Sequence, residues 1–225
     1  MKPAASQNLE IAIPNAGTVS ALLDLPPQAR ACYVFAHGAG VGMMHSYMAA
    51  VAAGLAERGI ATLRYQFPYM EKGTKRPDPP PVAHAAVRAA VMEAARLCPG
   101  LPLIAGGKSF GGRMTSQAQA SAPLDGVRGL AFFGFPLHPA GKPSDDRAKH
   151  LSRVKIPMLF LQGTRDSLAE MNLLEPVVKR IGQSVTLHRV EGADHSFHVP
   201  ARSGRNDAEV MREILDAFAA WIGAI

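Results

Sequence analysis

Three polar residues, Ser109, Asp166 and His195, follow one another along the chain in an order that suits nucleophilic catalysis. Ser109 is the central residue of the pentapeptide G-K-S-F-G at positions 107–111. A serine hydroxyl attacks a carbonyl at neutral pH only when a base takes its proton, and the base needs a carboxylate to fix its tautomer. These residue types predict a catalytic triad in which Ser109 is the nucleophile, His195 the base and Asp166 the orienting acid.

The pentapeptide around Ser109 has the G-x-S-x-G pattern of a sharp strand-to-helix turn. It follows an apolar run at 101–105 and precedes a stretch without Gly or Pro at 113–122, which is suited to a helix. Glycine allows the close backbone approach that such a turn requires. A chain with 21 glycines also produces this spacing by chance, so an ordinary structural turn is the alternative interpretation.

The acid and the base each follow a predicted strand. The strand at 156–161 runs into Asp166, and the strand at 185–190 runs into His195. Functional loops of an open parallel sheet gather at the carboxyl ends of its strands, so we expect both side chains at the same edge as Ser109. Asp194 adjoins His195, but neighbouring side chains in an extended segment point apart, which favours Asp166 as the orienting acid.

Alternation of predicted strands and helices indicates an α/β fold with a doubly wound, mostly parallel sheet that begins with an antiparallel hairpin. We expect one domain over residues 1–225. The 57 residues from Ser109 to Asp166 leave no room for a large cap domain. Strands are predicted at 9–14, 18–25, 31–36, 60–65, 101–105, 127–135, 156–161 and 185–190, and helices at 46–58, 82–97, 110–122, 144–153, 168–181 and 206–222.

Over nearly its whole length the chain resembles an α/β-hydrolase of the dienelactone-hydrolase-like kind. Besides the serine pentapeptide, the segments that carry the resemblance are F-A-H-G-A-G at 35–40, Q-G-T-R-D at 162–166 and G-A-D-H-S-F at 192–197. The order Ser, Asp, His is also the one typical of this family.

A closer resemblance is to a set of small predicted hydrolases, through R-Y-Q-F-P-Y-M at 64–70 and F-P-L-H-P-A-G-K-P at 135–143. That set is related to the hydrolase-like domain of a chromatin acetyltransferase complex subunit, where the fold serves assembly. A non-catalytic protein-interaction module is therefore the alternative to an enzyme.

The resemblance implies a serine hydrolase that cleaves carboxylic esters or thioesters through an acyl-enzyme and needs no cofactor. It implies an oxyanion hole made of the backbone N–H groups of Ala39 and Phe110, whose side chains are left free by this role. The acyl chain and the leaving group stay open, and amide bonds are not excluded, because the loops that line the pocket set these preferences.

The segment 71–81 contains four prolines and three basic residues, and it follows the predicted strand at 60–65. Lys108, Arg113, His138 and Lys142 are expected to lie near this stiff loop. We hypothesise that such basic residues, with Lys75, Arg76 and His37, contact a small anionic substrate such as an ester that carries a carboxylate or a phosphate. Solvated charges on a surface loop are the alternative, and His37 is also suited to shaping the oxyanion loop.

Composition excludes several other classes of function. The net charge is +6, but basic and acidic residues are interspersed and only four tyrosines and one tryptophan are available for stacking, so nucleic-acid binding is not predicted. His195 and His198 form an H-x-x-H pair without a third ligand, so no metal site is predicted. Cys32 and Cys98 are expected to be buried, reduced thiols.

The sequence also bears on location. Residues 1–10 lack the apolar segment of a signal peptide, and no run approaches the roughly 20 apolar residues of a membrane span. We therefore expect a cytoplasmic protein that acts on a small-molecule ester and binds no membrane. The oligomeric state is open.

Overall fold

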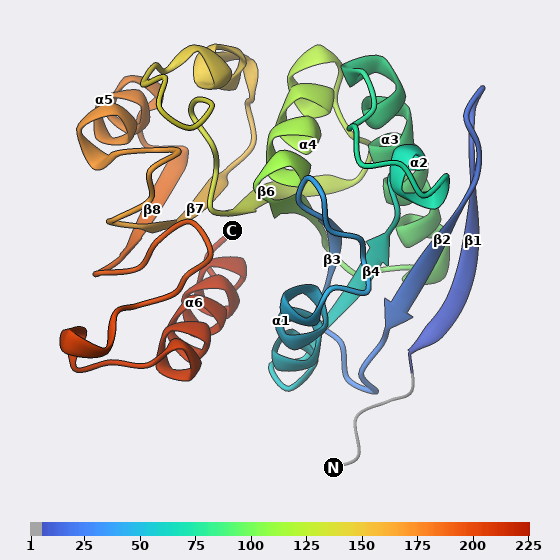
Figure 1. Ribbon diagram of the computed structural model, residues 1–225. Coiled ribbons are helices and arrows are strands. Elements are labelled where there is room, and N and C mark those ends of the chain that lie inside the picture. The colour runs from blue at the N-terminus through green and yellow to red at the C-terminus, as the bar shows by residue number, and fades with distance from the viewer. Residues whose placement is uncertain (1–5) are drawn as a thin grey trace.

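The computed structural model describes residues 6–225, and eight strands within this range form one sheet (Figure 1). The first five of the residues examined for a signal peptide lie outside the described range. The sheet order is β1-β2-β4-β3-β5-β6-β7-β8. The strands are β1 (Gln7–Ile13), β2 (Gly17–Asp24), β3 (Ala31–Ala36), β4 (Ile60–Tyr65), β5 (Leu103–Lys108), β6 (Val127–Phe133), β7 (Met158–Gly163) and β8 (Val185–Val190).

Helices cover both faces of this sheet, as Figure 1 shows. Apolar side chains of α1 and α6 pack on one face in one hydrophobic core, and those of α3, α4 and α5 pack on the other face in a second core. The helices are α1 (Ser46–Ala56), α2 (Pro68–Glu71), α3 (Pro80–Leu97), α4 (Phe110–Ser121), α5 (Met171–Ile181) and α6 (Asp207–Ile222), with the 3₁₀ helices η1 (Asp146–Arg153) and η2 (Ala201–Ser203).

The burial of each strand follows its place in the sheet. All residues of β3, β4 and β7 are buried, because helices cover both faces of these central strands. The edge strand β1 alternates between exposed and buried positions in its second half, and its register with β2 pairs Gln7 with Leu23 and Ile13 with Gly17. The predicted mostly parallel sheet with an antiparallel N-terminal hairpin is thereby confirmed.

Three of the expected helices need correction, one helix was not expected, and several strand bounds shift by two or three residues, as for β5 and β7. The segment predicted as a helix at 144–153 forms the 3₁₀ helix η1, and helix α5 begins at Met171 instead of 168 because the preceding residues turn back to bond Asp166. Helix α3 begins at Pro80 instead of 82. The first turn of a helix leaves its backbone N–H groups without partners, and proline suits this position because it has no N–H. The short helix α2 was not predicted, because four residues are too few for a periodic pattern.

The topology leaves one edge of the sheet open for a site. The carboxyl ends of β3, β5, β6, β7 and β8 lie there in this order, because these strands run parallel. Between β6 and β7 the chain forms only η1, so no large cap covers this edge, as predicted. Within residues 6–225, no helix combines the length and the apolar character needed to cross a membrane.

Candidate active site

Ser109 lies on the turn between β5 and α4, with backbone dihedrals of φ 50° and ψ −112°. A residue with a side chain adopts this region at a cost of about 1–3 kcal/mol, so the surrounding structure must hold it there. The turn is tight because a Cβ added at Gly111 would lie 2.5 Å from the carbonyl oxygen of Ala36, and one added at Gly107 would lie equally close to it. The two glycines therefore let the start of α4 approach the end of β3.

The three residues singled out for chemistry lie within hydrogen-bond distance of one another. His195 Nε2 lies 2.8 Å from Ser109 Oγ, and His195 Nδ1 lies 2.7 Å from Asp166 Oδ2. With Nδ1 protonated and donating to the carboxylate, Nε2 is free to accept the serine proton. The Asp166 side chain is fully buried, whereas 22% of the His195 side chain remains exposed. The imidazole thus faces the surface from which a substrate would approach.

Asp166 is held by contacts that leave its second oxygen directed at the histidine. Its Oδ1 accepts the backbone N–H of Leu168 at 2.8 Å, and its Oδ2 accepts the side-chain amide of Gln162 at 2.5 Å. The same Gln162 side chain accepts the backbone N–H of Phe135 at 2.8 Å, which fixes its orientation. Asp194, by contrast, accepts the backbone N–H groups of the residues two and four positions further on.

Two backbone N–H groups next to Ser109 are without a hydrogen-bond partner among residues 6–225. They belong to Ala39, in the loop after β3, and to Phe110, the first residue of α4. Ala39, Ser109 and Phe110 line the same cavity of about 370 Å³. Unsatisfied N–H groups at a helix start attract negative charge, so this arrangement suits an oxyanion.

The loop that carries Ala39 is held by the segment that follows β4. The buried ring of His37 accepts the backbone N–H of Phe67 at 3.0 Å through Nε2, so its protonated Nδ1 donates to the Gly38 carbonyl at 2.8 Å. Tyr69 Oη accepts the N–H of Gly40 at 3.3 Å. Burial lowers the pKa of His37 to about 4, so the ring is neutral. These contacts give His37 a supporting position without access to a substrate.

Lys108 faces away from the cavity that Ser109 lines. Its ammonium donates to the carbonyl oxygen of His195 and lies 5.2 Å from the centre of the Phe197 ring. Burial lowers the pKa of Lys108 to about 8, although Asp166 and Asp194 oppose this shift. The side chain therefore ties the nucleophile turn to the histidine loop.

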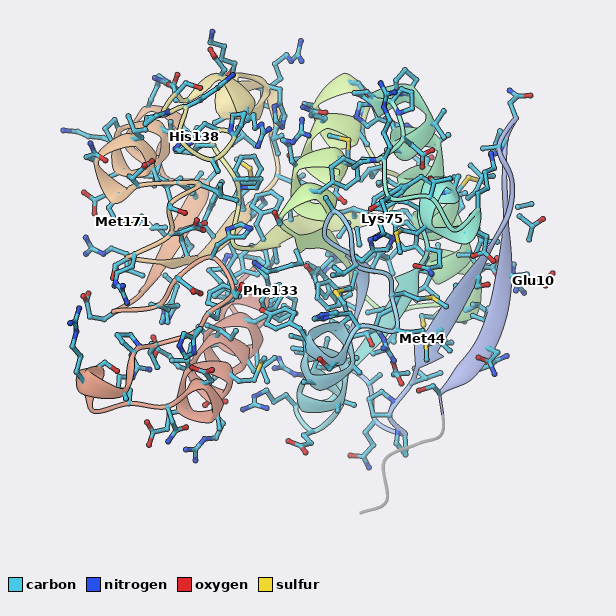
Figure 2. All side chains as sticks on the ribbon, in the orientation of Figure 1. Glu10, Met44, Lys75, Phe133, His138 and Met171 are labelled. Atoms are coloured by element: carbon cyan, nitrogen blue, oxygen red, sulfur yellow. The ribbon has the colours of Figure 1, made fainter. Side chains whose placement is uncertain are left out.

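Four further basic residues predicted to lie near a substrate do not line the Ser109 cavity either, namely Lys75, Arg76, His138 and Lys142. Lys75 and Arg76 are exposed, and Arg76 faces a separate surface hollow. His138 is buried and its Nε2 lies 2.5 Å from a carboxylate oxygen of Glu170, the residue before α5. Figure 2 shows Lys75 and His138 well apart. The Pro-rich loop does reach the cavity, through Pro77, Asp78 and Pro80.

Several residues that support the site were not singled out from the sequence. In the sequence, Gln162 and Gln66 stand out only as members of two motifs. In the structure, the Gln162 amide donates to Asp166, and the Gln66 side chain accepts the backbone N–H of Met43 at 2.9 Å. Arg113 and Arg147 both line the Ser109 cavity. Arg113, one helical turn after Ser109, was among the basic residues expected near an anionic substrate, whereas Arg147 was not. Nothing in the sequence pattern links Arg147 to Ser109.

Neutral histidines make the protein sensitive to acid. His150 Nε2 lies 2.8 Å from Ser116 Oγ, which itself donates to the Arg113 carbonyl, so the imidazole is the donor in this pair. Burial, aided by nearby positive charges, lowers the pKa of His150 to about 4. Between pH 6.5 and 4 the unfolded chain therefore binds a proton that the folded chain does not, and the free energy of unfolding falls as the pH falls.

We expect His150→Gln to flatten this dependence, because glutamine keeps a donor for Ser116 and does not titrate. The slope of unfolding free energy against pH should decrease by about 1 kcal/mol per pH unit between pH 6 and 4.5. Urea denaturation of both proteins across this range measures the difference. Parallel curves would show that His150 is not held neutral in the folded state.

The second histidine of the H-x-x-H pair has a different partner. His198 Nδ1 lies 2.9 Å from a carboxylate oxygen of Asp207, which raises the pKa of the histidine. Within residues 6–225, no three His, Cys, Asp or Glu side chains gather as metal ligands would.

A mostly parallel sheet, an N-terminal hairpin and a serine at a tight turn after β5 define an α/β-hydrolase. Residues 29–223 match the family model described as an alpha/beta hydrolase domain, and the chain therefore belongs to this family.

Solved structures of similar fold cover almost the whole chain. A dienelactone hydrolase from Anabaena variabilis superposes with a TM-score of 0.79 at 19% identity, covering 100% of this chain and 99% of its own. XC6422 from Xanthomonas campestris, described as an α/β serine hydrolase without a lid, has a TM-score of 0.73 at 20% identity and covers 98% and 97%. Est1E from Butyrivibrio proteoclasticus with bound ferulic acid has a TM-score of 0.69 at 18% identity and covers 94% and 99%. At these identities the likeness concerns the fold alone.

Proposed function

We propose that this protein is a serine hydrolase that cleaves carboxylic esters or thioesters of small substrates. The observation that carries the proposal is the chain of contacts from Ser109 Oγ to His195 Nε2 and from His195 Nδ1 to Asp166, at 2.8 Å and 2.7 Å. This geometry matches the requirement for an activated serine, in which the base lies within hydrogen-bond reach of the nucleophile and is itself oriented by a third group.

In the proposed reaction, Ser109 Oγ attacks the carbonyl carbon of the ester while His195 takes the hydroxyl proton. The resulting tetrahedral oxyanion accepts hydrogen bonds from the N–H groups of Ala39 and Phe110. Each preorganised donor of this kind contributes about 3 kcal/mol of transition-state stabilisation.

Collapse of this intermediate expels the alcohol or thiol, which receives the proton from His195. Water then attacks the acyl-enzyme, and His195 serves as base and acid in the same order. The buried Asp166 stabilises the imidazolium in both half-reactions.

The surroundings of Ser109 favour small substrates. No large cap covers the carboxyl edge of the sheet, and the cavity of about 370 Å³ is open to solvent. Its apolar lining comes from Phe110, Met114 and Leu168, together with prolines of the loop before α3. Such a site has room for a short acyl chain or a compact leaving group.

Labelling with a fluorophosphonate tests the proposal, because this reagent reacts with serines that a neighbouring base has activated. We expect the wild-type protein to be labelled and Ser109→Ala to be unlabelled. Ser196→Ala is the matched control, since Ser196 is exposed and adjoins His195 in the chain. Absence of labelling in folded wild-type protein would overturn the proposal and favour a non-catalytic interaction module, which a search for binding partners would then address.

A further inference from the structure

Arg113 and Arg147 are two cations without a matching anion in the cavity that Ser109 lines. Neither residue takes part in an ion pair within residues 6–225. The Nε atom of Arg113 is buried and has no hydrogen-bond partner in the same range. Buried polar groups normally find partners, so an unpaired guanidinium nitrogen beside a reactive serine indicates an absent ligand.

The positive charge in this region is not neutralised by its neighbours. Burial lowers the pKa of Arg113 to about 10, and the nearby Arg147 adds to the shift, yet the group stays charged at neutral pH. Arg113 also contributes to the lowered pKa values of His84 and His150, and Arg153 contributes to the latter. Basic groups therefore surround Arg113, and the first turn of α4 contains no acidic residue.

One carboxylate, that of Asp78, does line the cavity. Its Oδ2 accepts the backbone N–H of Tyr69 at 2.9 Å, which engages it with α2. Asp78 lies beyond ion-pair distance of both arginines, since no such pair forms among the described residues. Two guanidinium groups thus face one carboxylate that is already hydrogen-bonded.

The places of Arg113 and Arg147 in the fold bring their positive charges into the cavity that Ser109 lines. Arg113 follows Ser109 by four residues, and α4 side chains lean toward the helix start, so its guanidinium carbon lies 5.7 Å from the centre of the Phe110 ring. Arg147 reaches the cavity from η1, on the chain between β6 and β7. The two arginines hence approach the cavity from different elements, and neither His195 nor Lys108 lines it.

We propose that Arg113 and Arg147 together bind an anionic group of the substrate, a carboxylate or a phosphate, while Ser109 attacks the ester bond in the same cavity. This inference rests on the proposed function for the reacting bond and adds the substrate class. Guanidinium groups suit the role because their forked N–H donors match carboxylate and phosphate oxygens in pairs. Of the basic residues expected from the sequence to contact an anion, it retains Arg113. It adds Arg147 in place of Lys75, Arg76, Lys108, His138, Lys142 and His37, which do not line the cavity.

Pairs of esters that differ in one anionic group measure the preference of the enzyme for an anionic substrate. The mono-p-nitrophenyl ester of succinic acid is compared with p-nitrophenyl butyrate, and 4-acetoxyphenyl phosphate with phenyl acetate, so that carboxylate and phosphate are examined separately. We expect wild-type kcat/KM to favour at least one anionic ester, and Arg147→Met to lower that ratio by about 10–100-fold, as for loss of a charged hydrogen-bonded contact. Turnover of the neutral ester should change little.

Two further variants separate specific contact from general charge. Arg153→Met removes the same charge from an exposed neighbour that does not line the cavity, and we expect it to leave the ratio unchanged. Arg147→Lys retains the charge without the fork, so the ratio should be intermediate. Equal ratios in wild type, Arg147→Met and Arg113→Met, with all variants folded by circular dichroism, would overturn the proposal.

A measurement of anion binding tests the arginine site separately from the proposed hydrolase activity. Isothermal titration of the Ser109→Ala protein with monomethyl succinate and with inorganic phosphate reports on the arginines whether or not the serine is active. We expect binding that weakens at least about tenfold when Arg147→Met is added. Binding that depends on Arg147 in a protein without fluorophosphonate labelling would retain the anion site and reject the hydrolase. Labelling together with no arginine-dependent anion binding and no anion preference would retain the hydrolase and reject the anion site.

Discussion

Replacement of Ser109 by alanine is expected to lower kcat toward a short-chain p-nitrophenyl ester by about 10⁶-fold, as seen when a triad nucleophile is removed. The physical reason is that, among residues 6–225, Ser109 Oγ is the one hydroxyl that contacts His195 Nε2, at 2.8 Å. The residual rate reflects stabilisation of the oxyanion by the N–H groups of Ala39 and Phe110, with water as nucleophile.

The readout for this prediction is steady-state turnover at matched protein concentration, with Ser196→Ala as the control. Ser196 lies on the exposed histidine loop and its hydroxyl has no partner among the described residues, so its loss should leave turnover unchanged. Turnover by Ser109→Ala that stays close to wild type would show that another group performs the reaction.

Replacement of Asp166 by asparagine is expected to lower kcat by about 10⁴-fold while the protein remains folded. The carboxylate accepts three donors, from Leu168, Gln162 and His195. An asparagine that keeps its oxygen toward the Leu168 N–H turns its amide NH₂ toward the imidazole. His195 Nδ1 then becomes the acceptor, its proton moves to Nε2, and the imidazole is no longer able to accept the proton of Ser109.

Asp194→Asn is the matched control for this substitution. Asp194 Oδ1 accepts backbone N–H groups of Ser196 and His198 at 2.8 Å and 3.0 Å, and an asparagine oxygen serves equally well. We expect nearly unchanged kcat for Asp194→Asn, measured beside Asp166→Asn, with urea denaturation of both variants to verify folding. A comparable loss in both variants would mean that the orienting role of Asp166 is wrong.

Most of the fold was accessible from the sequence. The runs that became β3, β4 and β7 are buried along their whole length and are mostly apolar, as is typical of strands covered on both faces, with Thr62, Arg64 and Gln162 as the polar exceptions. Helix boundaries were less accessible where other contacts compete with helical hydrogen bonds. Leu168 N–H bonds the Asp166 carboxylate instead of entering a helix, which moves the start of α5 to Met171.

The structure brings Ser109, Asp166 and His195 together, but it does not bring most of the basic residues expected to contact substrate into the cavity that Ser109 lines. Contact with a substrate was expected of Lys108, His138 and Lys75 because they are basic and follow strands or lie near motifs. The direction of a side chain, however, is set by tertiary packing. Lys108 turns to the His195 carbonyl, and His138 pairs with Glu170. Arg147 enters the cavity from a segment 38 residues after Ser109, a proximity that only the folded chain produces.

The sequence by itself determined the order of strands and helices and the residues that the proposed mechanism uses, because hydrophobic periodicity and a glycine-flanked serine are local properties of the chain. Tertiary structure decided which backbone N–H groups stay unpaired, which carboxylate faces His195, and which cations line the cavity beside Ser109. These outcomes depend on contacts between strands, helices and loops far apart in the sequence, and on burial that leaves Arg113 Nε without a partner among the described residues.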